Sequence, residues 1–105
     1  MVKVLKDSVF NEEVINKKGI VLVDVYATWC GPCKMLAPIF EEVGNEMNGQ
    51  AGFYKVDIDE SLELANEYGI QSVPTMLVFK NGEVVDRVVG VVPKASLKSK
   101  VEQQL

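Results

Sequence analysis

Residues 20–38 read IVLVDVYATWCGPCKMLAP, and this stretch decides the fold because it changes character halfway. Its first eight residues form an almost continuous apolar run rich in β-branched side chains, which is typical of a strand covered on both faces in a parallel sheet. The second half, continued to residue 49, places apolar residues at helical spacing. Pro32 suits the first turn of that helix, where its missing N–H is not needed. The stretch therefore predicts a buried strand that turns directly into a helix.

Further strand and helix patterns flank this unit on both sides. The additional elements are expected as strands at 2–6, 52–59, 74–80 and 83–90, and as helices at 7–19, 61–69 and 94–105. Asn81-Gly82, between the last two strands, is a strong signal for a type I′ hairpin turn. The order βαβαβαββα predicts an α/β fold with a central mixed β-sheet flanked by helices on both faces. A length of 105 residues suits one domain that covers residues 1–105.

The bulk composition argues against several classes of function. The chain has 11 basic and 15 acidic side chains, a formal net charge of −4 and no basic cluster, which argues against general nucleic-acid binding. No apolar run is long enough to span a bilayer, and the first ten residues lack the apolar core of a secretory signal. We therefore expect a cytoplasmic protein without membrane association, in a compartment where structural disulfides are rare.

The two cysteines of the chain, Cys30 and Cys33, lie three residues apart at the expected start of the helix. This spacing brings their Cβ atoms to about 5–6 Å on one face, close enough for a disulfide. Such a disulfide would close a very short loop and add little stability, because the stabilisation grows with loop length. Incidental thiols or half of a zinc site are the alternatives for an isolated Cys-x-x-Cys pair. Since the chain has no histidine, a metal site would need ligands from a second copy, and we expect none within one chain.

The position of the pair at a helix N-terminus favours redox chemistry. Unpaired N–H groups and the positive end of the helix dipole stabilise a thiolate, so we expect Cys30 to have a lowered pKa and to be the exposed nucleophile. Cys33, one turn further into the helix, is expected to be more buried and less ionised. One exposed attacking thiol and one sheltered thiol are what thiol–disulfide exchange requires.

Asp24 interrupts the apolar strand, and its neighbours along the chain are apolar. A buried carboxylate is costly, so it should have a raised pKa and a polar partner, for which Lys55 is the candidate. The alternatives are an aspartate that caps a loop at the strand end and a lysine that simply lies at the surface.

Trp29 and Gly90 each allow two interpretations. Trp29 is either a core aromatic or a partly exposed docking residue beside the Gly-Pro turn. Gly90 either ends a strand in a turn or lets a substrate backbone approach closely, and the two roles are compatible.

Several motifs together resemble the thioredoxin family over essentially the whole chain. They are WCGPCK after VDVYAT, then KVDID, YGIQSVPT, FKNGE and VVG. Trp-Cys-Gly-Pro-Cys with the downstream Val-Pro-Thr is the specific part of the resemblance, whereas Cys-x-x-Cys alone is weak. Two positions depart from the family pattern: Tyr26 stands where several members have tryptophan, and Ser72 stands where glycine is frequent. The second departure bears on loop flexibility and partner preference, not on the chemistry.

The resemblance implies a thioredoxin fold and an enzyme that reduces protein disulfides through a mixed-disulfide intermediate, without a bound cofactor. It implies that Cys30 attacks the substrate and that Cys33 resolves the intermediate. Asp24, partnered by Lys55, is implied to take the proton from Cys33 through water. A thioredoxin-like subunit that clamps a partner protein without turnover is the second class of function, and a metal-binding module is the third.

The remaining matched residues are implied to set the redox potential and to bind substrates. Gly31 and Pro32 match the dipeptide that shifts the potential toward reduction. Pro74 is implied to follow a cis peptide bond and to face the cysteines. We expect the protein to be a monomer. Its implied partners are a thioredoxin reductase, which recharges it, and disulfide-containing proteins. The implied docking surface is apolar and consists of Trp29, Ile58, Val73, Pro74, Val89 and Gly90.

Overall fold

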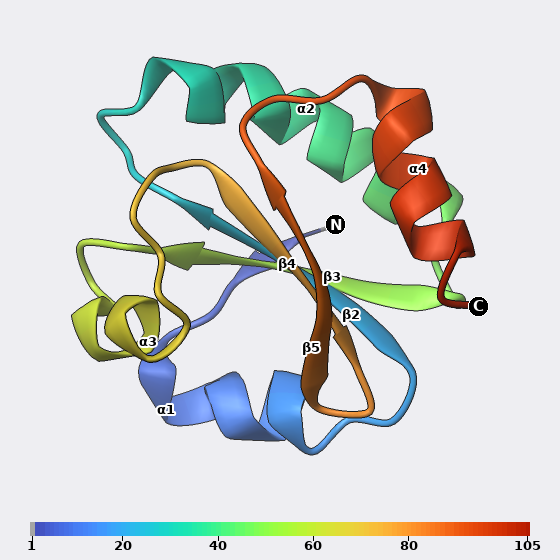
Figure 1. The fold of residues 1–105 in the computed structure, drawn as a ribbon, viewed down its shortest axis with the longest axis horizontal. Coiled ribbons are helices and arrows are strands. Elements are labelled where there is room, and N and C mark those ends of the chain that lie inside the picture. Colours follow the sequence, from blue (N-terminus) through green and yellow to red (C-terminus); the bar gives the residue numbers. More distant parts are fainter. Residues whose placement is uncertain (1) are drawn as a thin grey trace.

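The chain forms one mixed sheet with helices on both faces, as the sequence predicts (Figure 1). The structure is a computed structural model that describes residues 2–105. In chain order, its elements are β1 (Lys3–Val4), α1 (Asp7–Phe10), the π-helix η1 (Asn11–Ile15), β2 (Ile20–Tyr26), α2 (Gly31–Glu46), β3 (Ala51–Asp57), α3 (Leu62–Glu67), β4 (Thr75–Lys80), β5 (Glu83–Val89) and α4 (Lys94–Glu102).

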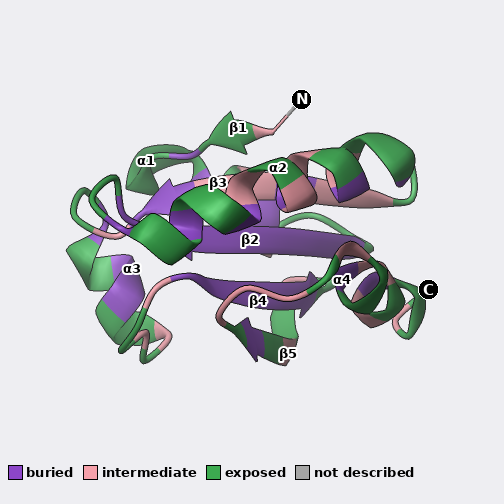
Figure 2. Ribbon diagram, turned by 90° about the horizontal axis from the view of Figure 1, so that it is seen from above, coloured by how far each residue is buried: buried purple, intermediate pink, exposed green. Residues whose placement is uncertain are grey.

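The central strand of the sheet is β2. The strand order is β1-β3-β2-β4-β5, in which β1 and β2 run parallel to β3, and β4 runs antiparallel to β2 and β5. Because β2 has a strand on each side and a helix layer on each face, every residue of it except Tyr26 is buried. Figure 2 shows β2 and β4 as buried strands between the more exposed helices. This position accounts for the apolar run of residues 20–27.

Two apolar cores lie on opposite faces of the sheet. Leu22 belongs to the core under α2 and α4, whereas Val21 and Val23 belong to the core under α1, η1 and α3. Successive side chains of a strand point to opposite faces, so Asp24 lies on the same face as Leu22, toward α2. The strand thus places a carboxylate on the face of the sheet that the cysteine-bearing helix covers.

Several elements are shorter than the periodicity predicts. The expected helix over 7–19 is a four-residue α-helix followed by a five-residue π-helix that ends at Ile15, where the N–H of Asn16 donates to the carbonyl of Asn11 at 2.8 Å. The first strand has two residues, and α2 and α4 end three residues before the expected 49 and 105. Apolar periodicity marks the buried face of an element but not the residue at which its hydrogen bonds stop.

The hairpin turn has the predicted geometry. Asn81 and Gly82 have φ angles of 53° and 85°, and two positive φ angles at the centre of a two-residue loop are the mark of a type I′ turn. Within residues 2–105, no helix has the length and apolar character that a membrane crossing requires.

Candidate active site

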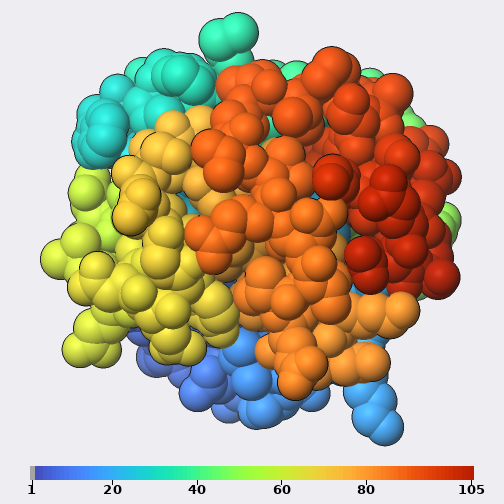
Figure 3. Space-filling model, in the orientation of Figure 1, coloured from blue at the N-terminus to red at the C-terminus, as the bar shows by residue number. Residues whose placement is uncertain are grey.

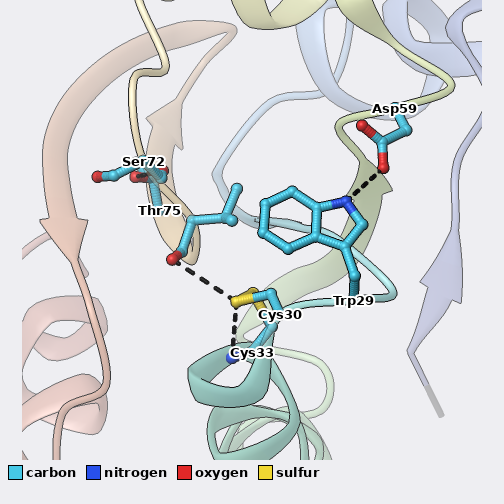
Figure 4. The surroundings of a disulfide bond; sticks show 7 residues. Trp29, Cys30, Cys33, Asp59, Ser72 and Thr75 are labelled. Carbon is cyan, nitrogen blue, oxygen red and sulfur yellow. Dashed lines mark hydrogen bonds between the residues drawn. A yellow bond between two sulfur atoms is a disulfide. The ribbon is translucent and has the colours of Figure 1, made fainter.

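The two cysteines lie where β2 leads into α2 (Figure 4). Cys30 is the N-cap residue of α2 and has an extended backbone, while Gly31 and Pro32 begin the first turn. The Cα atoms of Cys30 and Cys33 are 5.3 Å apart, and their sulfur atoms are bonded to each other. A Cα separation in this range is what a disulfide needs, so the spacing at the helix start brings the pair together without further help.

The sulfur of Cys30 is in contact with two backbone groups. It accepts a hydrogen bond from the N–H of Cys33 at 3.2 Å, and it lies 3.7 Å from the carbonyl oxygen of Val73. The N–H of Cys33 belongs to the first turn of α2, whose donors have no partner within the helix. Together with the helix dipole, this donor favours negative charge on the Cys30 sulfur. The lowered pKa of the Cys30 thiol stays a prediction that this geometry supports.

The expected difference in exposure between the two cysteines is wrong for the disulfide form. Cys30 is 5% exposed and Cys33 is 4% exposed. The loop before β4 is responsible, since Val73 packs with Ala27 and both cysteines in one small apolar cluster. Figure 3 shows the segment at the start of α2 and the loop before β4 side by side at the surface. The two cysteines therefore differ in their hydrogen bonds, not in the burial of the residue as a whole.

Asp24 lies in the interior of β2 and has no exposed surface. Its neighbours across the sheet are Lys55 on β3 and Met76 on β4. Burial raises the pKa of Asp24 from 3.8 to about 6, and the charge of Lys55 offsets part of that rise. The predicted burial and raised pKa are confirmed, whereas the alternative of a loop cap at the strand end is wrong.

The expected polar contact between Asp24 and Lys55 is wrong. In the part of the chain that the structure describes, neither carboxylate oxygen of Asp24 has a hydrogen-bond partner. The Nζ atom of Lys55 instead lies 4.4 Å from the ring centroid of Tyr26. The physical reason is that Tyr26 follows Asp24 by two residues on the same face of β2 and offers the lysine an aromatic surface. Lys55 thus acts on Asp24 through its charge, without a hydrogen bond.

Trp29 lies at the surface beside the disulfide, so the alternative of a core aromatic is wrong. Its side chain is 69% exposed, and its indole Nε1–H donates a hydrogen bond of 2.8 Å to Oδ2 of Asp59 (Figure 4). The ring borders a hollow of about 420 Å³ that Ile58, Leu62 and Val73 also line. Trp29, Ile58 and Val73 of the predicted docking surface therefore meet around one cavity.

Sequence reasoning missed Asp59 and Leu62 at this hollow. Leu62 is 65% exposed although it begins α3, and the buried residues of that helix are Leu64 and Ala65. A leucine outside the apolar period of its helix was a signal that could have found it. Asp59 gave no such signal, because its hydrogen bond joins residues 30 positions apart.

The other docking residues lie on the loop before β4 and at the end of β5. The Val73–Pro74 peptide bond is cis, as the resemblance implies, and the hydroxyl of Thr75 donates to the carbonyl of Ser72 at 2.7 Å. Pro74 is buried, and its carbonyl accepts a hydrogen bond of 2.9 Å from the N–H of Gly90. These bonds tie the loop that touches Cys30 to the end of the hairpin.

Gly90 has a backbone conformation that favours glycine. Its φ angle is +88°, and a Cβ atom at this position would meet no heavy atom within 4 Å. The residue before it, Val89, is 61% exposed. The left-handed backbone explains the glycine by itself, and the open space beside it leaves room for a substrate chain as well.

At this end of the sheet the described residues gather two sulfurs, a buried carboxylate, an ammonium group and an exposed indole. Residues 2–105 bring no group of three or more His, Cys, Asp or Glu side chains together that could hold a metal ion.

Comparisons with known proteins agree with this geometry. A family model described as Thioredoxin matches residues 1–103. Thioredoxin 1 of Nostoc sp. is 46% identical over 94% of this chain and 92% of its own length. The chloroplastic M-type thioredoxin of Pisum sativum is 51% identical over 99% of this chain, which spans 60% of the length of that relative. The solved structure of Malassezia sympodialis thioredoxin superposes with a TM-score of 0.89 at 40% identity, covering 99% of this chain and 90% of that one.

Proposed function

The chain belongs to the thioredoxin family and is a protein-disulfide oxidoreductase, and we propose that it serves as a reductant of protein disulfides. The observation that carries this proposal is the Cys30–Cys33 disulfide at the start of α2, in which the Cys30 sulfur accepts the N–H of Cys33. A disulfide that closes so short a loop adds little to stability, so its formation and cleavage leave the fold intact.

The proposed cycle has two exchanges in which electrons and protons balance. The Cys30 thiolate attacks one sulfur of the substrate disulfide, a Cys30–substrate bond forms, and the other substrate sulfur leaves as a thiolate that takes a proton. Cys33 then loses its proton and attacks the Cys30 sulfur. The Cys30–Cys33 disulfide forms, and the second substrate sulfur leaves with the bonding electron pair and is protonated. The substrate gains two electrons, and the protein loses two.

Asp24 is proposed to accept the proton of Cys33 in the second exchange, through a water molecule. A buried carboxylate with a pKa of about 6 is largely ionised at neutral pH and can still take up a proton there. Gly31 and Pro32, in the first turn between the two cysteines, are proposed to set the reduction potential.

The substrate is proposed to be an extended protein segment that carries a disulfide. The hollow beside Trp29 and the exposed Val89 offer apolar contact, and the backbone of Val73 lies next to the sulfur of Cys30. Backbone groups at such a loop can pair with an added strand. Ile58, Pro74 and Gly90 complete this proposed surface.

The partners and the location follow from the same proposal. A thioredoxin reductase would return the disulfide to the dithiol, and the protein would act as a monomer. The predicted cytoplasmic location stays a proposal, since the relative from Pisum sativum is named as chloroplastic.

A turnover assay tests the proposed function. The wild-type protein should reduce a protein disulfide at the expense of a small dithiol, and Cys30→Ser and Cys33→Ser should each abolish turnover. A subunit that only clamps a partner protein would keep its effect on that partner in the double variant Cys30→Ser/Cys33→Ser. Turnover that persists in this double variant would contradict the proposed chemistry.

A further inference from the structure

The ammonium group of Lys55 lies over an aromatic ring. Its Nζ atom lies 4.4 Å from the ring centroid of Tyr26, within the range of a cation–π contact. Lys94, Lys98 and Lys100 pair with carboxylates, but Lys55 makes no ion pair with any residue between 2 and 105. Within the described residues, the ammonium group thus faces an aromatic ring and not a carboxylate.

The Tyr26–Lys55 pair borders the resolving cysteine. Tyr26, Lys55 and Cys33 line the same hollow of about 220 Å³, together with Lys34 and Ala37 of α2. On the strands, Lys55 is the β3 neighbour of Asp24, and Tyr26 follows Asp24 on the same face of β2. The ring thus lies against the ammonium group of a lysine that lines one hollow with Cys33 and is paired with Asp24 across the strands.

The charges around Asp24 come from different elements. On β3, Lys55 lowers the pKa of Asp24. The charges of Asp57, on β3, and of Glu60, which follows that strand, raise the pKa of Tyr26. They have the same sign as the charge of Asp24. On β4, the paired residue is Met76, which has no charge. On α2, Cys33 and Lys34 line the hollow.

We propose that Tyr26 is a positioning residue whose ring holds the Lys55 ammonium beside this hollow, so that Asp24 stays ionised and accepts the proton of Cys33. The inference rests on the proposed function, because it concerns the exchange in which Cys33 attacks the mixed disulfide. Without the ring, the flexible lysine chain would carry its charge into water, where its effect on Asp24 is screened. The ring face makes the contact, so the tyrosine hydroxyl is not required.

The test separates the two exchanges in one stopped-flow experiment. The reduced protein is mixed with excess 5,5′-dithiobis(2-nitrobenzoate). Cys30 attacks the disulfide of this reagent, and one coloured thiolate is released. The attack of Cys33 on the resulting mixed disulfide then releases a second. The two phases are followed between pH 5 and 8 for the wild type, Tyr26→Leu, Tyr26→Phe, Lys55→Met and the double variant Tyr26→Leu/Lys55→Met.

We expect Tyr26→Leu to slow the second phase at pH 6 by roughly two- to fivefold, the size of a cation–π contact at a partly exposed site. Its pH profile should move to higher pH. Tyr26→Phe should restore wild-type behaviour, and Tyr26→Leu should add nothing in the Lys55→Met background. A wild-type second phase in Tyr26→Leu, or the same slowing in both backgrounds, would overturn the inference.

Two further measurements keep the inference separable from folding and from the proposed function. If Tyr26→Leu does not fold, Tyr26→Met takes its place, since methionine also lacks the aromatic face, and an unchanged pH profile of the second phase in either Tyr26→Met or Lys55→Met overturns the inference. A ¹³C NMR titration of the Asp24 carboxyl group in the oxidised protein should move to higher pH in Lys55→Met, independently of any turnover. A wild-type protein without a second phase would contradict the proposed function instead.

Discussion

Asp24 and Lys55 occupy paired positions on adjacent parallel strands, yet no hydrogen bond joins them. The carboxylate is fully buried, and burial raises its pKa to about 6 against the weaker effect of the lysine charge. An ionised carboxylate without a partner in an apolar interior lowers the stability of the folded state. The residue proposed to accept a proton is therefore also a residue that destabilises the fold at neutral pH.

Asp24→Asn should stabilise the protein most at neutral and higher pH. Because the folded pKa lies above the unfolded value, the stabilising contribution of this group is present below about pH 4 and is lost as pH rises through about 6. The rise from 3.8 to about 6 corresponds to about 3 kcal/mol of unfolding free energy at most. Urea unfolding of both proteins between pH 4 and 8 measures this difference.

The matched control for Asp24→Asn is an exposed carboxylate. Glu83 lies exposed on β5, and Glu83→Gln should shift stability little over the same range. An Asp24→Asn variant that is less stable than the wild type at pH 7 would contradict the effect of burial. The same variant should resolve mixed disulfides more slowly, since an amide does not accept the proton of Cys33.

The backbone pattern of this site could be predicted from local sequence, but its side-chain contacts could not. The apolar run around Asp24 indicates burial, and Pro32 with the helical spacing after it places Cys30 at a helix start. The contact of Lys55 with Tyr26 depends on the register of two strands and on a flexible chain. The cover over Cys30 comes from Val73, which lies 43 positions away. Local periodicity contains no information about such contacts.

The two cysteines should not be interchangeable in trapping experiments. With Cys33→Ser, Cys30 keeps its place at the start of α2, so attack occurs without resolution and mixed disulfides should accumulate. With Cys30→Ser, the nucleophile is absent, and neither turnover nor trapping is expected. Mass spectrometry of adducts from a lysate compares the two variants, and equal trapping by both would refute the assigned roles.

Gly90→Ala should destabilise the protein by about 1–2 kcal/mol, because its φ angle of +88° is unfavourable for a residue with a Cβ atom. Gly90→Asn should cost less, since asparagine adopts positive φ more readily. Gly31→Ala is the control for stability, because a Cβ atom there also meets open space. Gly31 lies in the first turn of α2 and has no positive φ angle, so alanine should cause no strain at this position. Chemical unfolding of the three variants decides, and a Gly90→Ala variant as stable as the wild type would contradict the strain.

The hydrogen bond between Trp29 and Asp59 should hold the indole ring against the hollow that is proposed to receive substrates. Trp29 is the one tryptophan of the chain, so its fluorescence anisotropy reports the motion of this ring directly. Asp59→Ala removes the acceptor, and the 69% exposed indole ring should then move more freely. A lost hydrogen bond of about 0.5–1.5 kcal/mol should raise KM for a protein disulfide by roughly two- to tenfold.

Asp59→Asn separates the geometry of this bond from the charge of Asp59. It keeps an oxygen that can accept the indole N–H, so it should restore both the anisotropy and KM. The reaction with a small aromatic disulfide should stay near the wild-type rate in both variants, because such a substrate needs no contact beyond the Cys30 sulfur. If Asp59→Ala left the anisotropy and KM unchanged, the hydrogen bond would not position Trp29. If Asp59→Asn behaved like Asp59→Ala, the negative charge would be the property that matters.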